Sequence, residues 1–215
     1  MIELQDVFGN DLTVVNAARV SFAKESYEMT LGDEKLVQYL AKHNHISPFF
    51  HPQIRFRIQM PIFIAREWYR HQIGFARNEV SRRYIDSKPE CWIPKVLRER
   101  DTNLKQGSKD TEVPQADMLK KIITDHTDES VNLYEYLLAE NVAPEVARCV
   151  LPQSMFTEFI ETGSLAAYAR LYKLRSDPTA QREIQEYARV IGERIEEYFP
   201  ISWKALTKES NSVST

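Results

Sequence analysis

Polar and apolar residues alternate strictly over residues 53–60, where the apolar set is Ile54, Phe56, Ile58 and Met60. Successive side chains of a strand point to opposite faces, so this pattern predicts a strand buried on one side. Residues 155–162 alternate less regularly and predict a second strand. A short strand is expected over residues 3–8, because turn-forming residues follow it at 9–11.

Apolar residues at helical spacing predict that much of the remaining chain is helical. The expected helices are 12–22 with Asp11 as its cap, 32–43, 62–71 with Pro61 at its first position, 115–140, a short helix from Pro144, 165–174, and a last helix that Thr179 caps and that stops before Pro200. Residues 87–100 predict extended chain, because two prolines interrupt any helix. Residues 99–117 predict an exposed polar loop, and residues 208–215 a frayed tail.

These elements predict a mixed α+β fold. A chain of 215 residues most simply forms one domain, here residues 1–207. Hydrophobic residues make up 43% and charged residues 27%, as in ordinary globular proteins. No apolar run reaches about 18 residues, so no membrane span is expected. The first residues lack the features of a signal peptide, and two cysteines without a Cys-x-x-Cys pair fit a reducing cytoplasm. Cys149 is expected to be buried rather than reactive.

Basic residues crowd into residues 70–84, in a chain whose net charge is -3. The segment contains Arg70, His71, Arg77, Arg82 and Arg83. Planar guanidinium groups on a turn suit the binding of an anion such as phosphate. The other interpretation is a basic surface loop that forms salt bridges or touches nucleic acid, although the slightly acidic chain argues against a general nucleic-acid binder.

The order of residues in this segment resembles the signature of the flavin-dependent thymidylate synthases. The family pattern is Arg-His-Arg, a gap of seven residues, and Ser-x-Arg. Here Arg70-His71-Gln72 is followed by a longer gap, 73–80, and by Ser81-Arg82-Arg83. A second dense match begins at Leu174-Arg175-Ser176-Asp177, and shorter ones lie at 17–22, 45–51 and 143–152. The resemblance covers roughly residues 3–200. Because the match is imperfect, the chain resembles a divergent branch of the family, of the kind that phages carry.

The resemblance implies a twisted, mostly antiparallel sheet surrounded by helices, in a homotetramer with flavin sites at subunit interfaces. It implies FAD-dependent reductive methylation of dUMP to dTMP. Methylenetetrahydrofolate would supply the carbon and NADPH would reduce the flavin. In this family no cysteine attacks the base, and positioning and electrostatics activate it. The implied partners are dUMP and further copies of the chain, with no nucleic acid and no membrane.

The resemblance also implies two sets of site residues, with Arg175 as the catalytic residue that polarises the uracil. The dUMP set is Glu67, Arg70, Glu79, Ser81, Arg82, Arg83, Arg148 and Arg175. The FAD set is His45, Ser47, Arg70, His71, Gln72, Glu79, Ser164 and Arg170. The chain departs from the family at Gln72, which lacks the usual cation, and at residues 162–167, where the flavin-binding Asn and Arg are not reproduced.

Simpler structural roles remain open for several of these residues. Arg148 could pair with Glu145 and Arg175 with Asp177. Arg19 could meet phosphate, an acidic partner or only solvent. The histidines of residues 43–51 invite a zinc interpretation, which we reject because no compact further ligand is present.

Two other functions compete with thymidylate synthesis. One is a related flavoenzyme that modifies another pyrimidine nucleotide or forms a hydroxymethyl product. The other is an arginine-rich nucleic-acid-binding module, which would bind with salt-sensitive affinity and carry no yellow chromophore.

Overall fold

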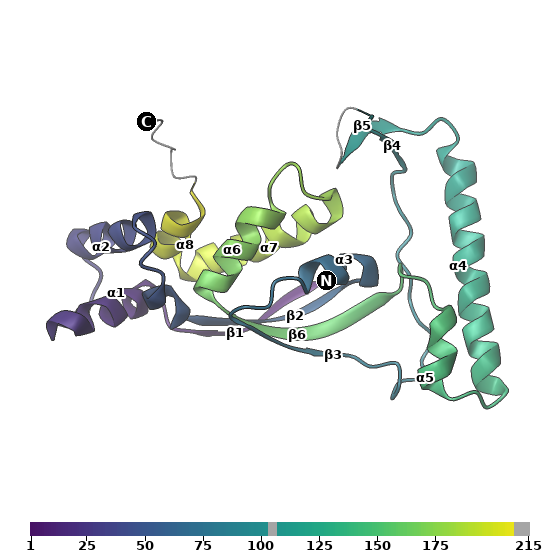
Figure 1. Cartoon of the computed structure of the whole chain (residues 1–215), viewed down its shortest axis with the longest axis horizontal. Coiled ribbons are helices and arrows are strands. Elements are labelled where there is room, and N and C mark those ends of the chain that lie inside the picture. Colours follow the sequence, from purple (N-terminus) through teal and green to yellow (C-terminus); the bar gives the residue numbers. More distant parts are fainter. Residues whose placement is uncertain (103–106, 209–215) are drawn as a thin grey trace. The chain divides into compact units, whose positions relative to one another are not determined.

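The computed structural model describes residues 1–102 and 107–208. Residues 103–106 of the predicted loop and 209–215 of the predicted tail lie outside the described residues. The chain divides into two compact units. Unit 1 comprises residues 1–58, 71–78 and 160–215, and unit 2 comprises residues 59–70 and 79–159. Figure 1 labels the elements of both.

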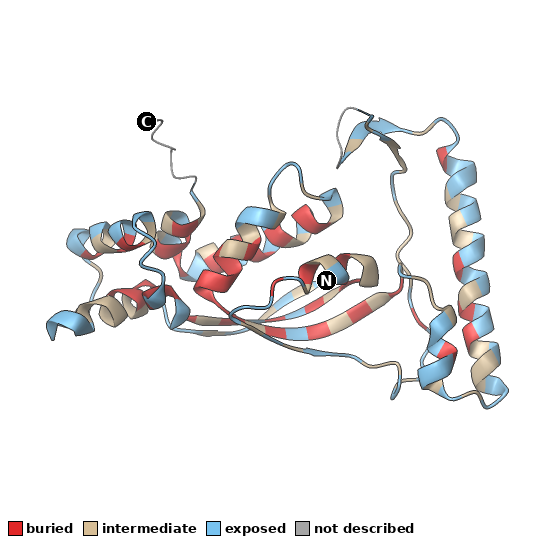
Figure 2. Ribbon diagram, in the orientation of Figure 1, coloured by how far each residue is buried: buried red, intermediate tan, exposed pale blue. Residues whose placement is uncertain are grey.

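Four strands form the main sheet in the order β1-β2-β6-β3. They are β1 (Ile2–Phe8), β2 (Gln53–Pro61), β6 (Phe156–Ser164) and β3 (Phe75–Glu79). β1 pairs with β2 antiparallel, with Ile2 opposite Ile58. Figure 2 shows buried residues alternating with intermediate or exposed ones along β2 and β6, and the pattern of β2 confirms the strand predicted over 53–60.

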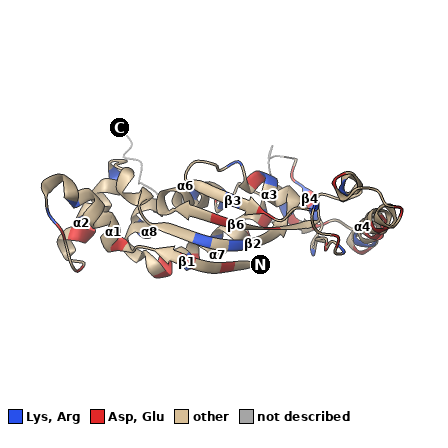
Figure 3. Ribbon diagram, turned by 90° about the horizontal axis from the view of Figure 1, so that it is seen from below, with Lys and Arg blue, Asp and Glu red and all other residues tan. Residues whose placement is uncertain are grey.

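The polar side of β2 is matched by charge on its neighbour. Arg55 and Arg57 of β2 lie opposite Asp6 and Glu3 of β1 in the strand register. Figure 3 shows these basic positions of β2 beside acidic positions of β1. Opposite charges across two strands favour this register over a shift by one residue, which would also turn the apolar face outward.

Unit 1 also contains helices, of which α7 packs against β1. They are α1 (Asp11–Arg19), η1 (Val20–Phe22), α2 (Leu31–Lys42), η2 (Ser47–Phe50), α6 (Leu165–Arg175), α7 (Arg182–Tyr198) and α8 (Pro200–Thr207). α8 packs against α2, α6 and α7. Gly192 of α7 allows α7 to pack closely on α6, since a Cβ there would meet the Tyr172 ring of α6 at 2.5 Å.

Unit 2 is built around one long helix. Its elements are α3 (Ile62–Trp68), β4 (Arg98–Arg100), β5 (Ser108–Glu112), α4 (Ala116–Ala139), α5 (Pro144–Ala147) and η3 (Arg148–Val150). α4 packs against α5 and η3. The Tyr69 ring meets the Phe159 ring edge-on, with centroids 5.0 Å apart.

Several predicted helix ends are wrong, and the caps explain why. Asn10, not Asp11, caps α1, because its side chain accepts the N–H groups of Leu12 and Thr13. Asp11 is buried and accepts the N–H groups of Ile201 and Ser202 at 3.0 and 2.8 Å. It therefore caps α8, a helix that the sequence did not predict.

Other predictions also differ from the structure. α3 ends at Trp68, so Arg70 and His71 lie beyond the helix. α7 begins after Gln181, whereas Thr179 hydrogen-bonds Asp177. The predicted loop over 99–117 contains β5 and most of β4, and these two strands pair with each other. Cys149 lies on η3 and is exposed rather than buried.

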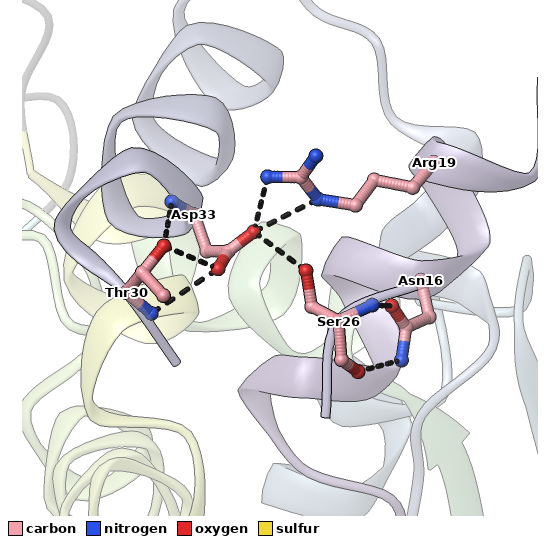
Figure 4. Close-up of polar contacts among 5 residues, drawn as sticks. All are labelled: Asn16, Arg19, Ser26, Thr30 and Asp33. Atoms are coloured by element: carbon pink, nitrogen blue, oxygen red, sulfur yellow. Dashed lines mark hydrogen bonds and ion pairs between the residues drawn. The ribbon is translucent and has the colours of Figure 1, made fainter. Parts of the chain in front are cut away.

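Arg19 has an acidic partner within the chain (Figure 4). Its Nε and Nη2 donate to Asp33 Oδ1 at 2.8 and 2.5 Å, and the Asp33 side chain is almost fully buried. Thr30 Oγ1 donates to Asp33 Oδ2 at 2.6 Å, and Ser26 Oγ donates to Oδ1 at 3.1 Å. The Thr30 hydroxyl and the other donors lower the Asp33 pKa to about 2, against the effect of burial. The network fixes the segment between α1 and α2.

Candidate active site

In unit 1, the segment from His71 to Gly74 lies against the N-terminal half of α6. Gly74 has φ +83°, a conformation that favours glycine. A Cβ at this position would meet Ala167 Cβ at 2.9 Å and Ser164 Oγ at 3.0 Å. The Ser164 N–H donates to the Gly74 carbonyl at 3.0 Å. Glycine is thus required both for the turn and for the close approach to α6.

Two predicted flavin residues, one at the start of α6 and one within it, have structural partners. Ser164 is buried and caps α6, because its Oγ accepts the Ala167 N–H at 3.2 Å. Arg170 Nη2 donates to the Ile73 carbonyl at 2.7 Å, and the Arg170 side chain remains half-exposed. Arg170 therefore holds the segment and keeps a cation near the surface, whereas Ser164 serves the helix end.

Arg175, at the end of α6, joins the second sequence motif to the first. Its Nε donates to His71 Nε2 at 2.9 Å, across 104 positions of sequence. Asp177, the alternative partner, accepts the N–H and hydroxyl of Thr179 at 2.8 and 2.5 Å. The His71 side chain is buried. Its pKa is lowered to about 4 by burial first and then by the positive charges of Arg175, Arg170 and Arg77. His71 is thus neutral at pH 7, and its Nε2 accepts.

A buried ion pair adjoins this segment and was missed by the sequence analysis. Arg77 of β3 pairs with Glu161 of β6, whose side chain is fully buried. The Arg77 guanidinium also lies 4.7 Å from the centroid of the Phe75 ring. Arg77 falls within the longer gap of the first motif. The available signal was Glu161, a charged residue in phase with the buried positions Thr157 and Phe159. We call His71, Arg77, Glu161, Arg170 and Arg175 the His71 cluster.

In unit 2, predicted phosphate residues gather around Glu145. Arg83 Nη2 lies 3.1 Å from the Glu145 carboxylate, and Arg148 Nε donates to the Glu145 backbone carbonyl at 3.3 Å. The predicted Arg148–Glu145 interaction therefore uses the backbone, and the carboxylate pairs with Arg83. Ser81 Oγ accepts the Arg83 N–H at 3.3 Å, and Arg82 donates to the Ser87 carbonyl. We call Ser81, Arg82, Arg83, Glu145 and Arg148 the Glu145 cluster.

The other predicted residues occupy separate places within each unit. Glu79 accepts the Thr157 hydroxyl at 2.5 Å, which fixes its carboxylate. Glu67 is half-buried on α3, and Arg70 is exposed beyond that helix. Gln72, His45 and Ser47 are exposed in unit 1. The His45 ring lies edge-on to Tyr39, with centroids 5.9 Å apart.

Two negative findings concern only residues 1–102 and 107–208. No group of three or more His, Cys, Asp or Glu side chains in them could hold a metal ion. Their helices include none that is both long enough and apolar enough to cross a membrane.

Comparisons with known proteins agree with the sequence motifs. Residues 3–201 match the family model of the thymidylate synthase complementing protein, Thy1. The chain is 40% identical to the flavin-dependent thymidylate synthase of Thermotoga neapolitana, over 96% of this chain and 90% of the relative. It is 37% identical to that of Thermus thermophilus, over 95% of this chain and 74% of the relative.

A solved structure supports the same assignment. The UMP/dUMP methylase PolB of Streptomyces cacaoi, bound with 5-Br dUMP, superposes with a TM-score of 0.87 and is 28% identical. The match covers 96% of this chain and 94% of that one. The α+β fold with an antiparallel sheet and helices is thereby confirmed. The chain belongs to the Thy1 family, the family of the flavin-dependent thymidylate synthases.

Proposed function

We propose that the protein is a flavin-dependent thymidylate synthase that converts dUMP to dTMP. Methylenetetrahydrofolate supplies the carbon, and NADPH is the reductant. The observation that carries the proposal is the bond between Arg175 and His71, since it unites the two densest family motifs in one local site. The nearly full-length relatives named flavin-dependent thymidylate synthase support the reaction class.

The Glu145 cluster suits the phosphate and sugar of dUMP. Its arginines are held weakly, because the Arg83 and Glu145 side chains are 51% and 55% exposed and such pairs contribute only about 0–1 kcal/mol. A phosphate offers stronger, bidentate contacts to guanidinium groups. We assign Arg70, Ser81, Arg82, Arg83 and Arg148 to phosphate binding, and Glu79 and Glu67 to the nucleoside.

Arg175 is assigned to the uracil. A fixed cation at the N3/O4 edge stabilises negative charge as it develops on the ring. His71 is neutral at pH 7, so no imidazolium is available to protonate the negatively charged ring. The chain's own contribution is therefore to bind and polarise the base, without a cysteine nucleophile.

The exposed residues of unit 1 fit a flavin. His45, Ser47 and Gln72 are exposed and can hydrogen-bond, and Arg170 supplies a half-exposed cation. Ile73, 68% exposed, offers apolar surface to a planar ring. FAD, when bound, supplies the hydride for reduction of the transferred carbon. We assign His45, Ser47, Arg70, His71, Gln72, Glu79 and Arg170 to FAD and leave out Ser164, because it is buried as a helix cap.

We propose further that the active form is a cytoplasmic homotetramer, as the family resemblance implies. Light scattering of the FAD-loaded protein should give a mass close to four chains. A monomer with full activity would contradict this assignment.

The central test is product formation. Purified protein with FAD should be yellow, and it should form dTMP from dUMP, methylenetetrahydrofolate and NADPH, detected by mass spectrometry. Omitting any one of the substrates should stop the reaction. A colourless protein that binds DNA or RNA in a salt-sensitive manner would instead support the nucleic-acid-binding alternative.

A second candidate is methylation of UMP as well as dUMP. It is favoured by the structural similarity to PolB, a UMP/dUMP methylase, whose form bound with 5-Br UMP superposes with a TM-score of 0.85. The values of kcat/KM for UMP and dUMP, measured in parallel, separate the two functions. The same mass spectra distinguish a methyl from a hydroxymethyl product.

A further inference from the structure

The side-chain hydrogen bond between Arg175 and His71 pairs an arginine with a histidine instead of a carboxylate. The acceptor is a neutral imidazole nitrogen, 2.9 Å from Arg175 Nε. His71 is 7% exposed, so water is largely excluded from the acceptor. The donor in this bond is the Nε of the guanidinium.

A neutral acceptor and a carboxylate affect an arginine differently. A carboxylate fixes the side chain but compensates its charge, as Glu161 does for Arg77. An imidazole nitrogen fixes the side chain and does not itself compensate the charge. Arginine loses considerable rotamer freedom when it is held, so fixing it before the substrate binds removes that cost from the reaction.

We infer that His71 is a positioning residue that holds the Arg175 guanidinium through Nε without itself compensating the charge that acts on the uracil. The inference rests on the proposed function, in which Arg175 faces the base. It gives His71 a role toward an arginine of the chain, in addition to its expected place near the flavin.

The surroundings keep His71 in the form that this role requires. Arg175 and Arg170 face it from α6, and Arg77 faces it from β3. Three positive charges and burial all oppose a proton on the imidazole. With Nε2 as the acceptor, the neutral ring carries its proton on Nδ1.

Two substitutions that differ by one methylene group test the inference. In His71→Gln, the side-chain oxygen can reach the place of Nε2, whereas in His71→Asn it cannot. Both proteins are loaded with FAD, and thermal unfolding checks that they fold alike. We expect H71N to lose at least about tenfold more kcat than H71Q, the size of one hydrogen bond to a charged group. A merely structural or flavin-binding role does not predict this difference.

Two further measurements do not depend on turnover. Nitrogen NMR of the His71 ring should show a proton on Nδ1 and none on Nε2 from pH 6 to 8. In a double-mutant cycle on dUMP affinity, H71N should weaken dUMP binding when Arg175 is present. It should have little further effect on binding in the Arg175→Gln protein.

The outcomes separate this inference from the proposed function. A wild type that makes no methylated nucleotide would overturn the function, and the inference with it. An active wild type in which H71Q and H71N lose kcat equally, or in which H71N acts independently of Arg175, would overturn the inference alone.

Discussion

The two arginine clusters use the same side chain in opposite ways. In the His71 cluster, Arg77 pairs with a fully buried carboxylate and Arg175 bonds a buried imidazole. In the Glu145 cluster, Arg83 and its carboxylate partner are both more than half exposed. The first set is fixed by packing. The second is held by contacts that water screens.

This difference matches two tasks within one proposed reaction. A group that stabilises developing charge works best when it is already in place, because no reorganisation is then needed during the reaction. A group that captures phosphate from solution must release its earlier partner easily. The Glu145 carboxylate can be displaced at little cost, and Arg83 can then turn to the ligand.

The largest effect is expected at the fixed cluster. Arg175→Ala should lower kcat by about 100-fold or more, since the loss of one preorganised donor costs this much in comparable sites. Turnover is measured as dTMP formed. Arg194→Ala is a matched control, because Arg194 is an exposed arginine paired with Glu197 on α7. Near-normal turnover of R175A would remove the proposed distinction between the clusters.

The loss of stability should be much larger when a buried ion pair is disrupted than when an exposed one is, and Asp33 offers the clearest buried case. Asp33→Asn weakens several hydrogen bonds to a buried carboxylate and should lower the free energy of unfolding by about 2–3 kcal/mol. Glu145→Gln removes an exposed carboxylate and should cost about 0.5 kcal/mol or less. Urea denaturation measures both. Equal losses would show that burial does not govern these pairs.

The Glu145 cluster should affect binding rather than chemistry. Arg83→Ala or Arg148→Ala should raise KM for dUMP by about 10- to 100-fold, the value of one charge-assisted hydrogen bond, with a smaller change in kcat. Glu145→Gln is the counterpart, since it removes the competing carboxylate and should leave KM equal or lower. A large loss of kcat with unchanged KM in R83A would contradict the phosphate assignment.

A further effect is a change of stability with pH. The folded pKa of His71, about 4, lies below the ordinary value of 6.5. The unfolded chain therefore binds more protons between these values, and stability falls as pH falls from 6.5 to 4, by at most about 1.4 kcal/mol per pH unit. Asp33, lowered from 3.8 to about 2, adds a further loss between those two values. The free energy of unfolding, measured by urea denaturation from pH 8 to 5, should change less with pH in H71Q than in the wild type. An equal change in both proteins would contradict the depressed His71 pKa.

The features that the sequence predicted well are those with a local physical cause. The alternation over residues 53–60 required one buried face, and β2 has it. The helix over 115–140 was long and periodic, and α4 follows within one residue at each end. The motifs at 70–84 and 174–185 predicted the family, and the family model that matches residues 3–201 confirms it.

Predictions failed where the deciding partner is distant in the sequence. α8 begins at Pro200 and its first N–H groups are capped by Asp11, 190 and 191 positions away. The hairpin of β4 and β5 pairs two polar segments that show no alternation. No local pattern reports such contacts, because each half of the interaction resembles an ordinary turn or loop.

By itself, the sequence determined the fold class, the family and which arginines belong to the family motifs, since these follow from periodicity and motif order. Only the tertiary structure decided what holds each arginine. It gave Arg175 a neutral buried acceptor, Arg77 a buried carboxylate and Arg83 an exposed one. The physical reason is that the effect of a charge depends on burial and on its partner, and both arise only when distant segments pack together.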